Sequence, residues 1–146
     1  MRKYLTILCV IFFLGTSSIS CSNDRVSDRD DIDVDFTVLG ATIAEALYHN
    51  VINNAADYMG QLIRVSGTYH PMVFPQNDNT YHFIVVVPGD ECCQLHFEFR
   101  LPAEDMNPDS FPPILTLIEV TGVLSRYAES GVSYLYLADS EMIIMN

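Results

Sequence analysis

The sequence predicts a mainly β domain with one helix near its N-terminus, folded as a small five-stranded barrel of the OB type. After Gly60, apolar residues recur with a period of two, which is typical of strands. Turn residues divide this part of the chain into five runs. Gly67 and Gly122 each stand inside a run, where glycine commonly marks the sharp bend at a barrel corner. A small antiparallel β-sandwich is the alternative.

The predicted helix covers residues 43–52 and reaches Asp57 at most. Thr42, followed by Glu45 three residues later, has the spacing of a capping box and predicts the helix start. Apolar residues at every fourth position form one stripe for packing, made of Ile43, Leu47, Val51 and Ala55.

The five predicted strands cover residues 62–69, 80–87, 92–101, 114–124 and 132–137, and residues 142–145 extend the last strand after a break. An OB barrel usually has a helix between its third and fourth strands. Residues 102–113 occupy this place but contain four prolines, so we expect no helix there. The domain as a whole is predicted over residues 39–146.

The first 20 residues are typical of a signal peptide. A positively charged start precedes an apolar run over residues 4–14, which is too short to span a bilayer stably. The following Ile-Ser-Cys resembles the lipobox of bacterial lipoproteins, although Ser18 stands where Leu is preferred. The pattern predicts that Cys21 is lipidated and becomes the first residue of the mature chain. The alternative is ordinary signal cleavage, with Cys21 as a spare thiol.

Residues 21–38 read as the lipidated cysteine and an acidic tether. Between Ser22 and Asp35 there are six Asp and two Arg, a composition typical of a solvated, self-repelling linker. Asp31, Asp33 and Asp35 have the first ligand spacings of a calcium-binding EF-hand loop. However, Phe36 stands where that loop needs glycine, so a plain spacer is the better interpretation.

These N-terminal features predict an exported lipoprotein. It would be anchored on the outer side of the cytoplasmic membrane, or in the periplasm or outer membrane of a two-membrane cell. The net charge of −12, with only seven Lys and Arg, argues against a nucleic-acid partner. The expected partners are the membrane, through the lipid anchor, and an envelope protein or small ligand.

The hairpin of the second and third strands has two possible registers, and a slip of one residue exchanges their faces. In the preferred register, Tyr81, Phe83 and Val85 share an apolar inner face with Leu95, Phe97 and Phe99. His82 and His96 then become cross-strand neighbours on the outer face, and Glu98 lies beyond them. The other register mixes His96 with Phe83 and loses apolar burial.

In the preferred register, His82, His96 and Glu98 are candidate ligands for Zn²⁺ or Cu²⁺. The alternative is two surface histidines that bind no metal. The adjacent Cys92 and Cys93 allow three interpretations: a strained vicinal disulfide, a thiolate site for Cu(I) or Zn²⁺, or one buried and one exposed thiol without a role. Neighbouring strand residues point to opposite faces, which argues against joint ligation.

Two segments carry a resemblance to a known family. Residues 57–67, DYMGQLIRVSG, resemble the D-Y-x-G-K-x-V-x-V-x-G opening of a family of uncharacterised bacterial exported lipoproteins with OB-like domains. Residues 92–99, CCQLHFEF, resemble its C-C-x-x-G-[IL]-E-F motif, with His96 in place of glycine. The resemblance covers most of residues 42–140. It implies export and the barrel fold and adds no activity.

No hydrolase, metalloprotease or nucleotide-binding motif is present, so the sequence predicts a protein that is not an enzyme. Two hypotheses remain. The first is a lipid-anchored binding module without a cofactor, with Tyr127, Tyr134 and Tyr136 as the candidate ligand surface. The second is a metal-handling or thiol-redox lipoprotein that uses Cys92, Cys93 and the histidines.

Overall fold

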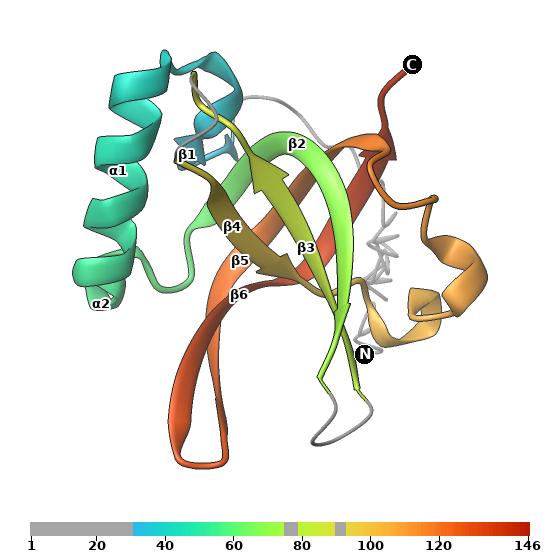
Figure 1. Cartoon of the computed structure of the whole chain (residues 1–146). Helices are drawn as coiled ribbons and strands as arrows, with labels where there is room; N and C mark the ends of the chain where they lie inside the picture. Colours follow the sequence, from blue (N-terminus) through green and yellow to red (C-terminus); the bar gives the residue numbers. More distant parts are fainter. Residues whose placement is uncertain (1–30, 75–78, 90–92) are drawn as a thin grey trace, which may run out of the picture.

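Five strands form a closed barrel in the computed structural model, which describes residues 31–74, 79–89 and 93–146 (Figure 1). The described residues contain six strands, of which β2 to β6 form the barrel: β1 (Val34–Asp35), β2 (Leu62–Val73), β3 (Thr80–Val86), β4 (Leu95–Phe99), β5 (Leu117–Glu129) and β6 (Val132–Ile144). Their order is β1-β2-β3-β4-β6-β5, and an additional pairing of β2 with β5 closes the barrel. The short β1 is added to β2 in parallel. The pairing of β4 with β6 is also parallel, at Phe99 and Leu137.

This arrangement confirms the prediction of a mainly β, OB-like barrel with one main helix. The alternative of an antiparallel sandwich is wrong, because β2 pairs with both β3 and β5. Two predicted strands were too short: β2 continues to Val73 and β5 to Glu129. The predicted break in the last strand is wrong, because β6 is continuous to Ile144 and passes through Asp139 with φ of 46°.

The barrel interior is filled by apolar side chains that are almost fully buried: Ile63, Val65, Ile84, Phe99, Ile118, Val120 and Leu137. The helix α1 (Ala41–Asn53), followed by α2 (Ala55–Tyr58), packs beside β4. The ring of Phe97 meets Phe36 and Tyr48 edge to face, with ring centroids 5.0 and 5.1 Å apart. Tyr48 also donates a 3.2 Å hydrogen bond to the carbonyl oxygen of His96.

The predicted helix start is wrong by two residues. Gly40 is the N-cap of α1 and makes no side-chain capping bond, so Thr42 and Glu45 form no capping box. The chain enters the helix from the 3-10 turn η2 (Phe36–Val38), which is itself capped by Asp35. The predicted stripe is confirmed at Leu47, Val51 and Ala55, which are buried or pack against the core. It is wrong at Ile43, which is 60% exposed, and Ala44 is buried in its place.

Both glycines predicted at barrel corners lie where a strand bends or changes partner. β2 pairs with β5 up to Thr68 and with β3 from Thr68 onward. A Cβ atom on Gly67 would collide with the carbonyl oxygen of Val85. Gly122 lies at an irregularity between β5 and β6, where a Cβ atom would collide with Ser140 Oγ. Both positions therefore need glycine for space, since neither has a positive φ.

The preferred register of the β3–β4 hairpin is wrong, and the rejected register is the one observed. His82 pairs with Phe99, Phe83 with Glu98, and Val85 with His96. His82 therefore faces the barrel interior, and His96 faces outward. The comparison of apolar burial failed because other parts of the chain cover the outer face of this hairpin, so Tyr81 and Val85 are buried there as well.

Residues 102–113 contain two single 3-10 turns, η3 (Ala103–Asp105) and η4 (Pro108–Ser110), and no α-helix, as predicted. In the part of the chain that the structure describes, no helix is both long and apolar enough to cross a membrane. The predicted signal peptide, Cys21 and most of the tether fall outside the described residues.

We predict that Gly67→Val and Gly122→Val each lower the free energy of unfolding by about 1–3 kcal/mol, because the added side chain must displace backbone or a packed neighbour. Urea denaturation measures this change. Ser133→Val, at an exposed position of β6, is the matched control and should stay within about 0.5 kcal/mol. Equal effects at all three positions would contradict the role of the two glycines.

Candidate ligand-binding groove

Two hollows lie side by side along β3 and β4: the second lies over their outer face, and the first also reaches His82 and Phe99 of the inner face. The first has a volume of about 410 Å³ and is lined by Asn79, Thr80, Tyr81, His82, Glu98, Phe99, Arg100, Met106, Tyr127, Ala128 and Glu129. The second has a volume of about 360 Å³ and is lined by Phe74, Tyr81, Phe83, Glu98, Tyr127, Glu129, Ser130 and Tyr134. Tyr81, Glu98, Tyr127 and Glu129 line both, so we describe the two hollows as one groove. Its size is that of a small-ligand site.

The β2–β3 and β5–β6 hairpins project from the same end of the barrel (Figure 1). Residues of both hairpins line the groove. Phe74, just after β2, forms one wall together with Tyr81 of β3, and their ring centroids are 5.2 Å apart. The β5–β6 hairpin forms the other wall, where Tyr127 and Tyr134 stack with centroids 5.3 Å apart. One aromatic pair therefore belongs to the β2–β3 hairpin and the other to the β5–β6 hairpin.

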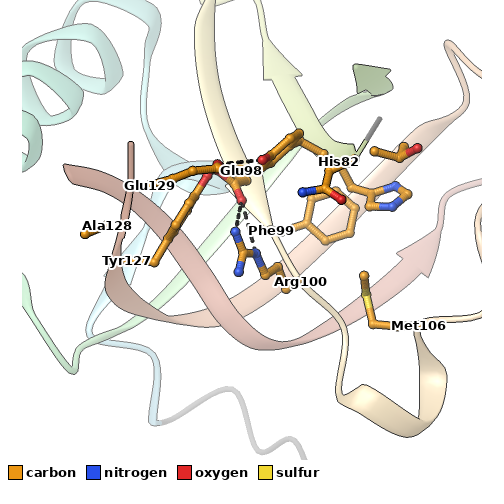
Figure 2. A pocket seen from close by; sticks show the side chains of 11 residues that line it. His82, Glu98, Phe99, Arg100, Met106, Tyr127, Ala128 and Glu129 are labelled. Atoms are coloured by element: carbon orange, nitrogen blue, oxygen red, sulfur yellow. Dashed lines mark hydrogen bonds and ion pairs between the residues drawn. The ribbon is translucent and has the colours of Figure 1, made fainter. Parts of the chain in front are cut away.

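A buried carboxylate lies at the floor of the groove, as Figure 2 shows. The side chain of Glu98 is only 5% exposed. Its Oε1 accepts hydrogen bonds from Arg100 Nε at 3.1 Å and Nη2 at 2.9 Å, and its Oε2 accepts one from the Tyr127 hydroxyl at 2.8 Å. A buried carboxylate needs such partners, because the desolvation of its charge is otherwise costly. Glu98 thus ties β4 to the β5–β6 hairpin.

Tyrosine rings hold the guanidinium of Arg100 in place. Its Cζ lies 4.1 Å from the ring centroid of Tyr127 and 4.6 Å from that of Tyr136, a cation–π arrangement. Burial and the hydrogen bond to Glu98 together raise the pKa of Tyr127 well above its usual range. Tyr127 therefore stays protonated near neutral pH and acts as a hydrogen-bond donor.

A second tyrosine–carboxylate pair crosses the groove. The Tyr81 hydroxyl donates a 2.5 Å hydrogen bond to Glu129 Oε2. Because both residues line both hollows, this pair lies between them. It links the start of β3 to the end of β5.

The three tyrosines predicted as a ligand surface come together in the structure. Tyr127 stacks on Tyr134 and meets Tyr136 edge to face at 5.5 Å. Tyr127 and Tyr134 line the groove, whereas Tyr136 supports Arg100. Whether they bind a ligand stays a prediction.

The predicted pairing of His82 with His96 is wrong, because the two residues lie on opposite faces of the sheet. The ring of His82 stacks on Phe111 at 3.6 Å, and its Nδ1 lies 2.7 Å from the Tyr69 hydroxyl. Burial lowers the pKa of His82. His96 is exposed on the outer face, which it shares with Glu98.

The structure describes one of the two adjacent cysteines. Cys93 is half-buried, while Cys92 lies outside the described residues, so the vicinal disulfide stays a prediction. Within residues 31–74, 79–89 and 93–146, no group of three or more His, Cys, Asp or Glu is placed to hold a metal ion.

Sequence reasoning missed Phe74, Arg100 and Glu129 as groove residues, and it placed Tyr81 in the interior. A signal for one of them was present: Arg100 follows Glu98 by two residues, so the two share a strand face and can pair. The contacts of Phe74 and Glu129 depend on the course of two hairpins and have no local signal.

The fold and the groove together define an OB-like barrel with an aromatic groove on its outer face. Comparison of the chain with protein-family models, with curated proteins and with solved structures found no match.

We predict that Tyr127→Phe lowers the free energy of unfolding by about 1–3 kcal/mol, because it removes a donor from the buried Glu98 carboxylate. Tyr134→Phe is the matched control: this tyrosine is 41% exposed and should change stability by less than about 0.5 kcal/mol. Both are measured by urea denaturation. Equal stability of the two variants would contradict the structural role of the Tyr127 hydroxyl.

Proposed function

We propose that this chain is a lipid-anchored, extracytoplasmic binding module without catalytic activity. The observation that carries the proposal is the groove between the two hairpins over β3 and β4. These strands are the second and third of the barrel, and OB barrels bind ligands on this face, between the corresponding loops. The ligand is a small molecule or a segment of an envelope protein.

The chemistry of the groove supports binding rather than catalysis. The carboxylate of Glu98 is committed to Arg100 and Tyr127 through three hydrogen bonds. Both carboxylate oxygens are therefore occupied within the fold, whereas a general base must reach a substrate. Exposed aromatic rings, such as those of Phe74 and Tyr134, instead offer contact area to a ligand.

The anchor is supported by the sequence of the N-terminus. A lipidated Cys21 followed by an acidic segment would hold the barrel near the membrane surface, while the strongly acidic chain is repelled from anionic headgroups. A thiol-redox or metal function would need Cys92, and the separation of His82 from His96 removes one pair of its predicted ligands. We therefore do not favour that alternative.

The groove is tested by an NMR screen of small fragments against the full chain in a maltoside detergent. We expect the fragments that bind to shift the resonances of Tyr81, Glu98 and Tyr127 more than those of the α1 surface. The matched pair Tyr134→Ala and Ile43→Ala separates the groove from an exposed apolar residue on α1. Only the first should weaken binding, and fragments that bind equally to both variants would contradict the proposal.

The anchor is tested separately by expressing the full chain in a bacterial host and measuring detergent-phase partitioning. We predict that Cys21→Ser moves the protein into the aqueous phase, because the thiol is the attachment site of the lipid. Cys9→Ser, in the same leader, is the control and should not change partitioning. Identical behaviour of both variants and the parent would contradict lipidation at Cys21.

A further inference from the structure

The second hollow has the composition of an aromatic cage. Of the eight residues that line it in the described part of the chain, five are aromatic, two are glutamates, and none is Arg or Lys. The aromatic residues come from three elements: Phe74 lies just after β2, Tyr81 and Phe83 share one face of β3, and Tyr127 and Tyr134 belong to the β5–β6 hairpin. Such cages bind the positively charged groups of organic cations through the electron-rich faces of the rings.

We propose that this hollow binds an organic ammonium group, such as a quaternary ammonium headgroup or a lysine side chain. The proposal rests on the proposed function, because it names the ligand class of the same groove. Ring exposure supports it: Phe74 is 44% and Tyr134 is 41% exposed, so both rings are open to a ligand.

The hydrogen bonds of the cage tyrosines favour a cation. Tyr127 donates to Glu98 and Tyr81 donates to Glu129. A phenol that donates to a carboxylate has a more electron-rich ring, which attracts a cation more strongly. The hydrogen bond from Tyr81 places the Glu129 carboxylate at the edge of the cage.

The first hollow contains an example of the same recognition within the chain. The guanidinium of Arg100 lies against Tyr127 and Tyr136 and pairs with Glu98. Tyrosine rings and a glutamate thus already hold one cation in this groove. The second hollow repeats the combination, with Tyr81, Tyr134 and Glu129, and its lining includes no arginine.

The charge of the whole protein acts in the same direction. A chain with a net charge of −12 raises the local concentration of cations near its surface and repels anionic ligands. A neutral, hydroxyl-rich ligand could also stack on the rings, but it would gain nothing from this field. The charge of the ligand is therefore the property to test.

The experiment compares choline with 3,3-dimethyl-1-butanol, its neutral carbon analogue, by NMR titration of the full chain in a maltoside detergent. We expect choline, or Nα-acetyl-lysine amide as the second cation, to bind at the groove at least about tenfold more tightly than the alcohol. The tighter of the two cations identifies the source, a methylated headgroup or a lysine side chain.

Variants separate the ring and the charge. Tyr134→Ala should weaken binding of the cation about tenfold, while Tyr134→Phe, which keeps the ring, should retain it. Glu129→Gln should weaken binding, and Glu141→Gln, an exposed acid on β6, should not. Circular dichroism of each variant confirms that it is folded.

Two outcomes overturn the inference, and they differ in what they say of the groove. Equal binding of choline and the neutral alcohol at the groove would leave it a ligand site but exclude recognition of charge. If neither cation shifts the groove resonances, the ammonium inference fails, and the fragment screen alone decides whether the groove binds ligands.

Discussion

β2 closes the barrel by pairing with two different strands, and this closure positions the other strands. This strand pairs with β5 along its first half and with β3 along its second half, and the exchange occurs beside Gly67. The backbone of Val85 is so near Gly67 that no side chain fits between them. The absence of a Cβ atom at this position therefore lets β3 approach β2 and complete the cylinder.

Closure also decides which residues of the β3–β4 hairpin face the interior. Ile84 is fully buried beside its partner Phe97, and the side chains of Phe83 and Glu98 are consequently outside. In a bare barrel this outer face would be solvated. Here the long β5–β6 hairpin extends past the barrel and covers it, and the Glu98–Tyr127 hydrogen bond fastens the hairpin to β4. The groove is the space left between this cover and the end of β2.

The sequence predicted what depends on local pattern. The period of two, the turn residues and the internal glycines predicted the strands and the barrel corners, and the prolines of residues 102–113 predicted the absence of a helix there. The hairpin register failed because it rested on the rule that apolar residues face inward. Tyr81 and Val85 are buried on the outer face, and His82 packs inside against Phe111, so the rule does not separate the two registers.

The candidate site was predictable to a similar extent. The alternation of Tyr134 and Tyr136 on one strand face, opposite Tyr127, is a local signal, and these tyrosines do cluster. The hydrogen bond between Glu98 and Tyr127 joins residues 29 positions apart, and only the closed barrel brings these two residues together. The predicted metal site of His82, His96 and Glu98 rested on the wrong register. In the observed register, His82 and His96 lie on opposite faces of the sheet.

The β3–β4 register and the groove are tested most directly by nuclear Overhauser effects in the isotopically labelled full chain in detergent. We expect contacts between the Tyr127 ring and the Arg100 side chain, together with cross-strand backbone contacts between Phe83 and Glu98. Cross-strand contacts that instead pair His82 with His96, without any contact between Tyr127 and Arg100, would contradict both the register and the groove built on it.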